Sequence, residues 1–317
     1  MISMRRHVVT IVAIFAALAV GVVLGSGLLS SGLVSGLRDD KAGLEHDLEV
    51  AAQENNRLGE QLNAADGFDG AVAGRVVRDA LPGRTVVLVS TPDTDPSDLE
   101  GVQHMIESAG GAVTGRLALT DAFVDATGGD RLRTVVNNVI PAGVTLGTGA
   151  VDQGSMAGDL IGAVLLTKPD APAPTEQERT LALDTLRGGG FISYEDGALA
   201  PAQSAVVVTG GGAAADTSMP ATGNRGAVVA RFAGALDGRS AGTVLAGRPE
   251  SARGNGAVAV ARADAALSSG LTTVDDVDRQ SGKITVALAL QEQSAGGSGR
   301  YGSGPGASAV TVGVPMG

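Results

Sequence analysis

The chain has 317 residues, of which 44% are hydrophobic and 18% are charged, a balance that excludes a wholly disordered protein. Its formal charge of −11 excludes a long basic track for phosphates, so we expect no nucleic-acid partner. Cysteine is absent, which excludes disulfides, thiolate metal sites and cysteine nucleophiles.

An uncharged and almost continuously apolar segment covers residues 8–29. At about 1.5 Å per residue this segment extends about 33 Å as a helix, enough to cross a hydrocarbon core of about 30 Å. Arg5 and Arg6 precede it, so the positive-inside tendency keeps residues 1–7 in the cytoplasm and places the body outside. The sequence predicts a single-pass protein of the cell membrane. A cleaved secretory signal is the alternative, and it also exports the body.

A heptad pattern follows over residues 34–65, with apolar residues at most a and d positions and charged residues between them. An asparagine at an a position favours a parallel two-stranded coiled coil. The pattern therefore predicts a coiled-coil stalk, which forms a parallel homodimer or pairs with a helix of a membrane partner. The alternative is a single amphipathic helix that packs on the chain's own body. The expected interface residues are Leu37, Leu44, Leu48, Asn55, Leu58 and Leu62.

Residues 82–293 alternate between strand and helix patterns. A β-branched run at 84–90, a helix over 97–109 and a strand over 112–119 form one βαβ unit. The alternation predicts an α/β fold with a mostly parallel sheet and helices on both faces. We expect residues 294–317, which are rich in glycine, to be a flexible tail. Further strands are expected at 191–194, 204–208, 243–246 and 257–261, and further helices at 130–139, 154–166, from Thr175, at 226–236 and at 280–292.

Motifs for catalysis and phosphate binding are missing from the sequence, so we do not expect an enzyme. Asp93, Asp95 and Asp98 follow the first strand, where α/β folds bind ligands, and their oxygens suit a hard cation. Turn formation and helix capping explain the same residues more economically. The acidic run at 275–278 before the last helix is explained by capping in the same way.

His104 and Met105 are the candidate metal ligands, because an imidazole and a thioether suit a soft ion such as Cu(I). Two adjacent residues on a helix, however, point in different directions. The alternative is an exposed helical histidine with no metal. Copper is therefore the candidate metal, although these two residues do not make a complete ligand set.

Segments at both ends of the chain resemble one known family. Residues 1–9 (MISMRRHVV), 19–27 (AVGVVLGSG), 271–278 (LTTVDDVD), 286–290 (VALAL) and 300–304 (RYGSG) occur in the order found in the actinobacterial copper transporter family, which includes MctB of mycobacteria and SteB of corynebacteria. The resemblance covers essentially the whole chain. It implies an envelope protein that supports copper homeostasis, and its corynebacterial branch implies a membrane partner, SteA, and a role in cell separation.

Two functions are therefore expected as alternatives. The first is a membrane-anchored extracytoplasmic protein that supports copper efflux. The second is a non-catalytic scaffold that binds a membrane partner through its coiled coil and regulates cell separation and cell-wall remodelling. Direct copper binding would favour the first function, and partner capture through residues 34–65 without copper binding would favour the second.

Overall fold

The computed structural model describes residues 3–27, 29–147, 149–168, 173–211 and 224–315. The chain divides into two compact units, Met1–Ala65 and Asp66–Gly317. Each unit is described by itself.

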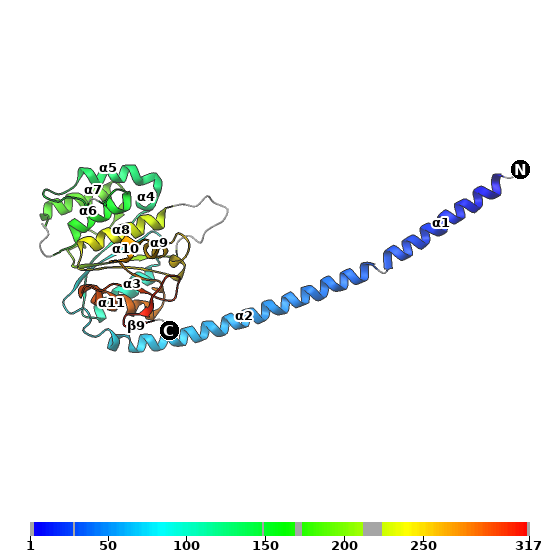
Figure 1. The fold of residues 1–317 in the computed structure, drawn as a ribbon, viewed down its shortest axis with the longest axis horizontal. Helices are drawn as coiled ribbons and strands as arrows, with labels where there is room; N and C mark the ends of the chain where they lie inside the picture. The colour runs from blue at the N-terminus through cyan, green and yellow to red at the C-terminus, as the bar shows by residue number, and fades with distance from the viewer. Residues whose placement is uncertain (1–2, 28, 148, 169–172, 212–223, 316–317) are drawn as a thin grey trace. The chain divides into compact units, whose positions relative to one another are not determined.

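The first unit consists of helix α1 (Ser3–Gly27) and most of helix α2 (Leu29–Val76) (Figure 1). Within α1, the stretch Arg6–Val23 is long and apolar enough to cross a membrane, and none of it is buried. In water such an exposed apolar stretch is unfavourable, and about 18 or more apolar residues suit a bilayer core. Residues 8–27 of the expected apolar segment are therefore helical, and Arg6–Val23 has the length and composition of a membrane span.

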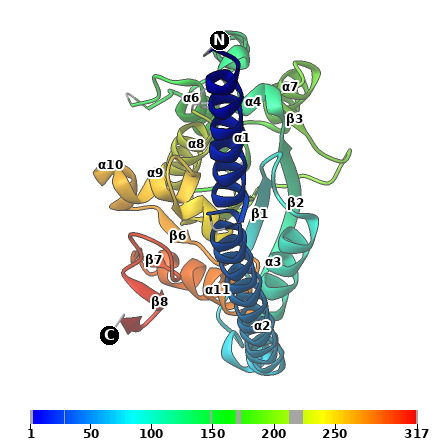
Figure 2. The ribbon, with the colours of Figure 1, turned by 90° about the vertical axis from the view of Figure 1, so that its right-hand side faces the viewer.

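The second unit contains a nine-stranded sheet in the order β3-β2-β1-β4-β5-β6-β7-β8-β9. Neighbouring strands are parallel except for the pairs β2–β3 and β8–β9. Figure 2 shows β6, β7 and β8 following one another toward the C-terminus. The strands are β1 (Thr85–Ser90), β2 (Ala112–Leu119), β3 (Ile192–Ser193), β4 (Ser204–Thr209), β5 (Thr243–Gly247), β6 (Thr272–Val274), β7 (Arg300–Tyr301), β8 (Ala309–Thr311) and β9 (Val314–Pro315).

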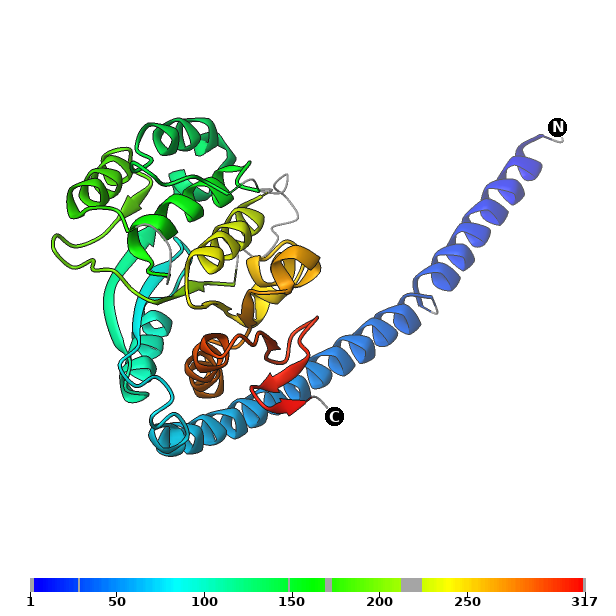
Figure 3. The same ribbon diagram turned by 60° about the vertical axis from the view of Figure 1, so that its left-hand side comes forward.

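Helices cover both faces of this sheet, with more of them on one face than on the other (Figures 1 and 3). One face packs against α4 to α10, and the other against α3 and α11. The end of α2 and the residue after it join the second face, because Ala73 and Val77 are buried there. The helices are α3 (Pro96–Ser108), α4 (Asp121–Val124), α5 (Gly129–Asn138), α6 (Gln153–Leu165), α7 (Glu176–Gly188), α8 (Arg225–Arg239), α9 (Ala257–Ala263), α10 (Ala265–Ser268) and α11 (Gln280–Ser294).

Alternation along β1 explains why both faces carry a core. Val87 and Val89 point into the cluster beneath α6 and α8, whereas Val86 and Leu88 point into the cluster beneath α3 and α11. Such a strand is buried on both sides, as expected for the centre of a parallel sheet. The predicted α/β class with a mostly parallel sheet is confirmed.

The glycine-rich C-terminal segment differs from the expected flexible tail. Residues 300–315 contain β7, β8 and β9, which extend the sheet. The buried guanidinium of Arg262 holds this segment by donating hydrogen bonds to the carbonyls of Tyr301, at 2.7 Å, and Pro305, at 3.0 Å. The carboxylate of Asp275 accepts hydrogen bonds from the amides of Ser303 and Gly304. Hydrogen bonds to the backbone, together with the buried side chain of Tyr301, thus order this glycine-rich stretch.

One predicted strand, over residues 257–261, is instead part of helix α9. Its alternating alanine and valine residues match the period of a strand. Alanine is also the best helix former, and Ala257, Val258 and Ala261 are buried at the i, i+1 and i+4 positions of a helix. Tertiary packing against α8 therefore decides the structure of this segment.

Candidate functional site

Strand order changes direction between β1 and β4, and the crevice beyond the carboxyl ends of these strands is the usual ligand site of doubly wound folds. In this chain, the protein's own groups occupy the described part of that crevice. The Thr91 hydroxyl donates to the Thr209 hydroxyl at 3.2 Å. Gly210 lies so close to the carbonyl of Asp93 that a Cβ atom would overlap it. These contacts hold the loop after β1 against the end of β4.

The acidic run after β1 is held by an arginine that follows β5. Arg248 donates from Nη2 to Asp95 at 2.8 Å and from Nε to Asp98 at 2.7 Å. Asp95 also caps α3 by accepting a hydrogen bond from the Ser97 amide at 2.9 Å. Asp95 thus caps a helix, as the more economical interpretation of the sequence predicts, and the ion pairs of Asp95 and Asp98 with Arg248 were not predicted.

A second acidic run follows β6, and its members differ sharply in environment. Asp275 is fully buried and pairs with Arg262 at 2.6 Å. Burial, with the neighbouring charge of Asp275, raises the pKa of Asp276 to about 6. Burial also raises the pKa of Asp278. One carboxylate oxygen each of Asp276 and Asp278 is buried without a hydrogen-bond partner among the described residues.

The structure does not bring the candidate metal ligands together. His104 is exposed on α3, whereas Met105 is 3% exposed and lies in the core between α3 and the sheet. Within the described ranges, no three histidine or acidic side chains converge as a metal site would require. The pair therefore forms no shared site, because adjacent helical positions face about 100° apart.

The expected interface residues lie on α2. Leu44, Leu48, Leu58 and Leu62 have exposed side chains, with 69% of Leu48 accessible, and Asn55 is exposed beside them. Leu37 belongs to the helix, but its side chain lies outside the described ones. Pairing of this helix with another helix stays a prediction.

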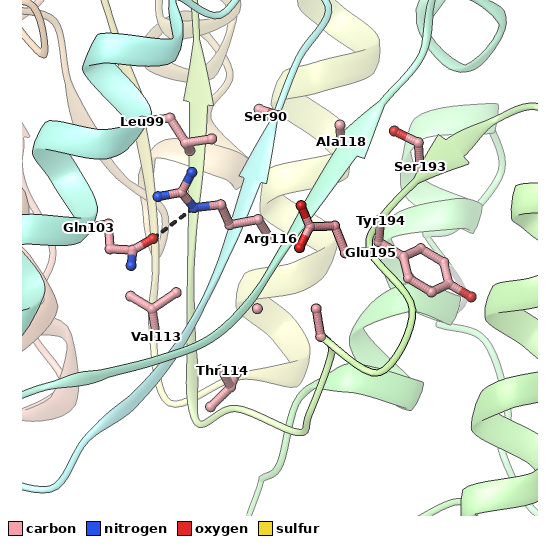
Figure 4. Close-up of a pocket in the computed structure, with 12 residues that line it drawn as sticks. Ser90, Leu99, Gln103, Val113, Thr114, Arg116, Ala118, Ser193, Tyr194 and Glu195 are labelled. Carbon is pink, nitrogen blue, oxygen red and sulfur yellow. Dashed lines mark hydrogen bonds between the residues drawn. The ribbon is translucent and has the colours of Figure 1, made fainter.

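A groove of about 660 Å³ lies beside β2, on the face of the sheet that α3 covers only in part (Figure 4). Arg116 extends from β2 across the groove, and its Nε donates to the side chain of Gln103 on α3 at 2.7 Å. Glu195, from the loop after β3, lies on the other side. The sequence did not predict this groove, because its residues form no motif and meet only in the fold. Residues that line it include Leu99, Gln103, Val113, Arg116, Ala118 and Glu195.

Comparison with known proteins agrees with the resemblance seen in the sequence. The family model described as "Copper transport outer membrane protein, MctB" matches residues 1–312. Copper transporter MctB of Mycobacterium tuberculosis (strain H37Rv) is 47% identical over 317 residues, which cover 98% of this chain and 99% of the relative. Copper transporter MctB of Mycobacterium leprae is 46% identical over 320 residues, with the same shares covered. This chain therefore belongs to the MctB family of copper transport proteins.

Proposed function

We propose that this chain is a single-pass protein anchored by residues 8–29 in the cytoplasmic membrane, with its body outside, where it supports copper efflux. The proposal depends mainly on one observation: the family model matches the apolar helix and the body together. The mycobacterial relatives are named copper transporters. The basic residues before the helix support a cytoplasmic N-terminus.

The proposed role in copper efflux is supportive, with the metal carried by a partner. A single helix cannot enclose an aqueous pore, and residues 8–29 contain no cysteine, methionine or acidic residue to receive a cation. His104 and Met105 diverge, as described above. We infer that the chain positions or regulates a copper-carrying protein of the envelope and does not itself hold the ion.

Copper binding and copper tolerance, measured on the same variants, test this role. The full-length chain in a strain that lacks the gene is expected to lower cell-associated copper and restore growth on copper. His104→Ala is expected to behave like the original chain in that strain. Equilibrium dialysis of the purified full-length protein is expected to show no stoichiometric copper binding. Stoichiometric binding that His104→Ala abolishes would keep the copper function but show that the chain itself holds the ion, which would refute a purely supportive role. Without copper binding, restored growth on copper is the result that separates this role from a scaffold with no copper function.

A second candidate function is a scaffold that binds a SteA-like membrane partner through residues 34–65 and regulates cell separation. The exposed leucines of α2 favour it, because apolar side chains at heptad spacing gain stability by burial against another helix. Replacing Leu48 and Leu62 with Asp is expected to abolish cross-linking of this region in intact membranes. Replacing Glu49 and Glu60, outside the a and d positions, with Gln is the matched control. Survival of the cross-linked complex in the leucine variant would contradict the heptad assignment.

A further inference from the structure

The groove beside β2 exists because the sheet is incompletely covered at this edge. Leu117 and Leu119 point into the core beneath α6 and α8, and they are almost fully buried. Arg116 and Ala118 alternate with them and face the other side, where Arg116 is exposed and Ala118 is half-buried. In a doubly wound fold a helix normally covers this face. Here the face is left open as the floor of the groove.

Part of the outer edge of β2 is also open. β3 pairs only with Ala118 and Leu119 among the eight residues of β2. After β3 the chain leaves the sheet and, in the described structure, returns to β2 at Thr114, whose carbonyl accepts a hydrogen bond from the Ala200 amide at 2.9 Å. Between these two points no described strand pairs with this edge of β2, but the backbone of Ala198 and Leu199 lies against Gly115, so the open part of the edge is the short stretch around Arg116. Main-chain groups at such an edge can pair with an extended peptide.

Two opposite charges flank the groove without being paired to each other. Gln103 engages only Nε of Arg116, so the two Nη groups have no described partner. The Glu195 carboxylate likewise has no hydrogen bond or ion pair among the described residues. Figure 4 shows Arg116 and Glu195 lining the same groove. Leu99, Val113 and Ala118 form its apolar wall. The site therefore offers a cation for a carboxylate and a carboxylate for an ammonium group.

The geometry points to a binding site for a short zwitterionic peptide, with its carboxylate on Arg116 and its ammonium group on Glu195. The groove follows β2 from Val113 to Ala118, a length of about 16 Å at the usual strand rise, whereas an extended tripeptide spans about 10 Å. Its volume of about 660 Å³ lies within the range of ligand pockets. This inference is independent of the proposed role in copper efflux.

Trialanine is the probe that tests the site, together with N-acetyl-trialanine, which lacks the ammonium group, and trialaninamide, which lacks the carboxylate. Isothermal titration calorimetry of the full-length protein in detergent micelles is expected to show that trialanine binds about tenfold more tightly than either blocked peptide, because each lost charge removes a charge-assisted hydrogen bond. Equal binding of all three peptides, or binding of none, would overturn the proposal.

Variants assign each end of the peptide to its residue. Arg116→Gln is expected to weaken trialanine about tenfold and to leave trialaninamide unchanged. Glu195→Gln, at an exposed loop position, is expected to weaken trialanine binding and to leave N-acetyl-trialanine binding unchanged. Arg253→Gln, an exposed arginine outside the groove, is the control for net charge. An equal loss of affinity in Arg253→Gln would show non-specific attraction and refute the site.

Discussion

At the scale of single residues, Asp276 links stability to pH. Burial raises its pKa from an ordinary 3.8 to about 6, so folding favours the protonated carboxyl group. The protonated Asp276 carboxyl group therefore gives its full contribution to the free energy of unfolding below about pH 4. This contribution is lost as the pH rises through about 6. Asp276→Asn is therefore expected to raise the free energy of unfolding at pH 7 by up to about 3 kcal/mol, since one pKa unit corresponds to about 1.4 kcal/mol.

Urea unfolding of the full-length protein in micelles, at pH 4 and pH 7, measures this effect. The gain from Asp276→Asn should appear at pH 7 and be nearly absent at pH 4, where the native carboxyl group is already protonated. Asp196→Asn is the matched control, because that carboxylate is 87% exposed and its removal should change stability little at either pH. An equal gain at both pH values would show that charge at Asp276 is not the cause.

At the scale of elements, a stripe of glycines sets how closely α6 and α8 approach. Gly154, Gly158 and Gly162 follow one another every four residues on α6 and face α8. A Cβ atom at Gly158 would lie 2.6 Å from the carbonyl oxygen of Phe232, a backbone atom that cannot turn away. Gly158→Ala is therefore expected to lower the free energy of unfolding by about 1–3 kcal/mol, despite the better helix propensity of alanine.

Gly238, near the end of α8, supplies the control for propensity. Nothing lies within 4 Å of a Cβ atom built there, so Gly238→Ala is expected to stabilise the protein by about 0.5–1 kcal/mol. Thermal unfolding followed by circular dichroism compares the two variants. If both substitutions stabilise, the helices can separate without cost, and close packing of α6 on α8 is not required.

The elements that the sequence predicts well are those whose signals are local. The strand at 84–90 and the helix from Thr175 agree with β1 and α7, and the side chains of Thr175 and Glu178 form a capping box at the start of α7. The C-terminal strands escaped prediction because Arg262 and Asp275, which hold them, are distant in sequence. The groove beside β2 escaped for the same reason, since Arg116 and Glu195 meet only after folding.

At the scale of the whole molecule, the composition that excludes disulfides also provides a clean test of orientation. Because the chain has no cysteine, a single introduced cysteine is its only thiol. Ser108, at the end of α3, is exposed on the body, and Ser3 is the first residue of α1, before its apolar stretch. With the body outside, a membrane-impermeant maleimide is expected to label Ser108→Cys in intact cells and to label Ser3→Cys only after lysis.

Each other outcome has a distinct physical meaning for the anchor. Labelling of Ser3→Cys but not of Ser108→Cys in intact cells would show the opposite orientation. Arg5 and Arg6 would then not determine the topology. A third outcome is that labelled Ser108→Cys is a shortened chain and that the mature Ser3→Cys variant has lost its cysteine. This outcome would identify residues 8–29 as a cleaved signal. In that case the body would be released, and any attachment to the membrane would depend on a partner, which makes the exposed face of α2 the surface to examine.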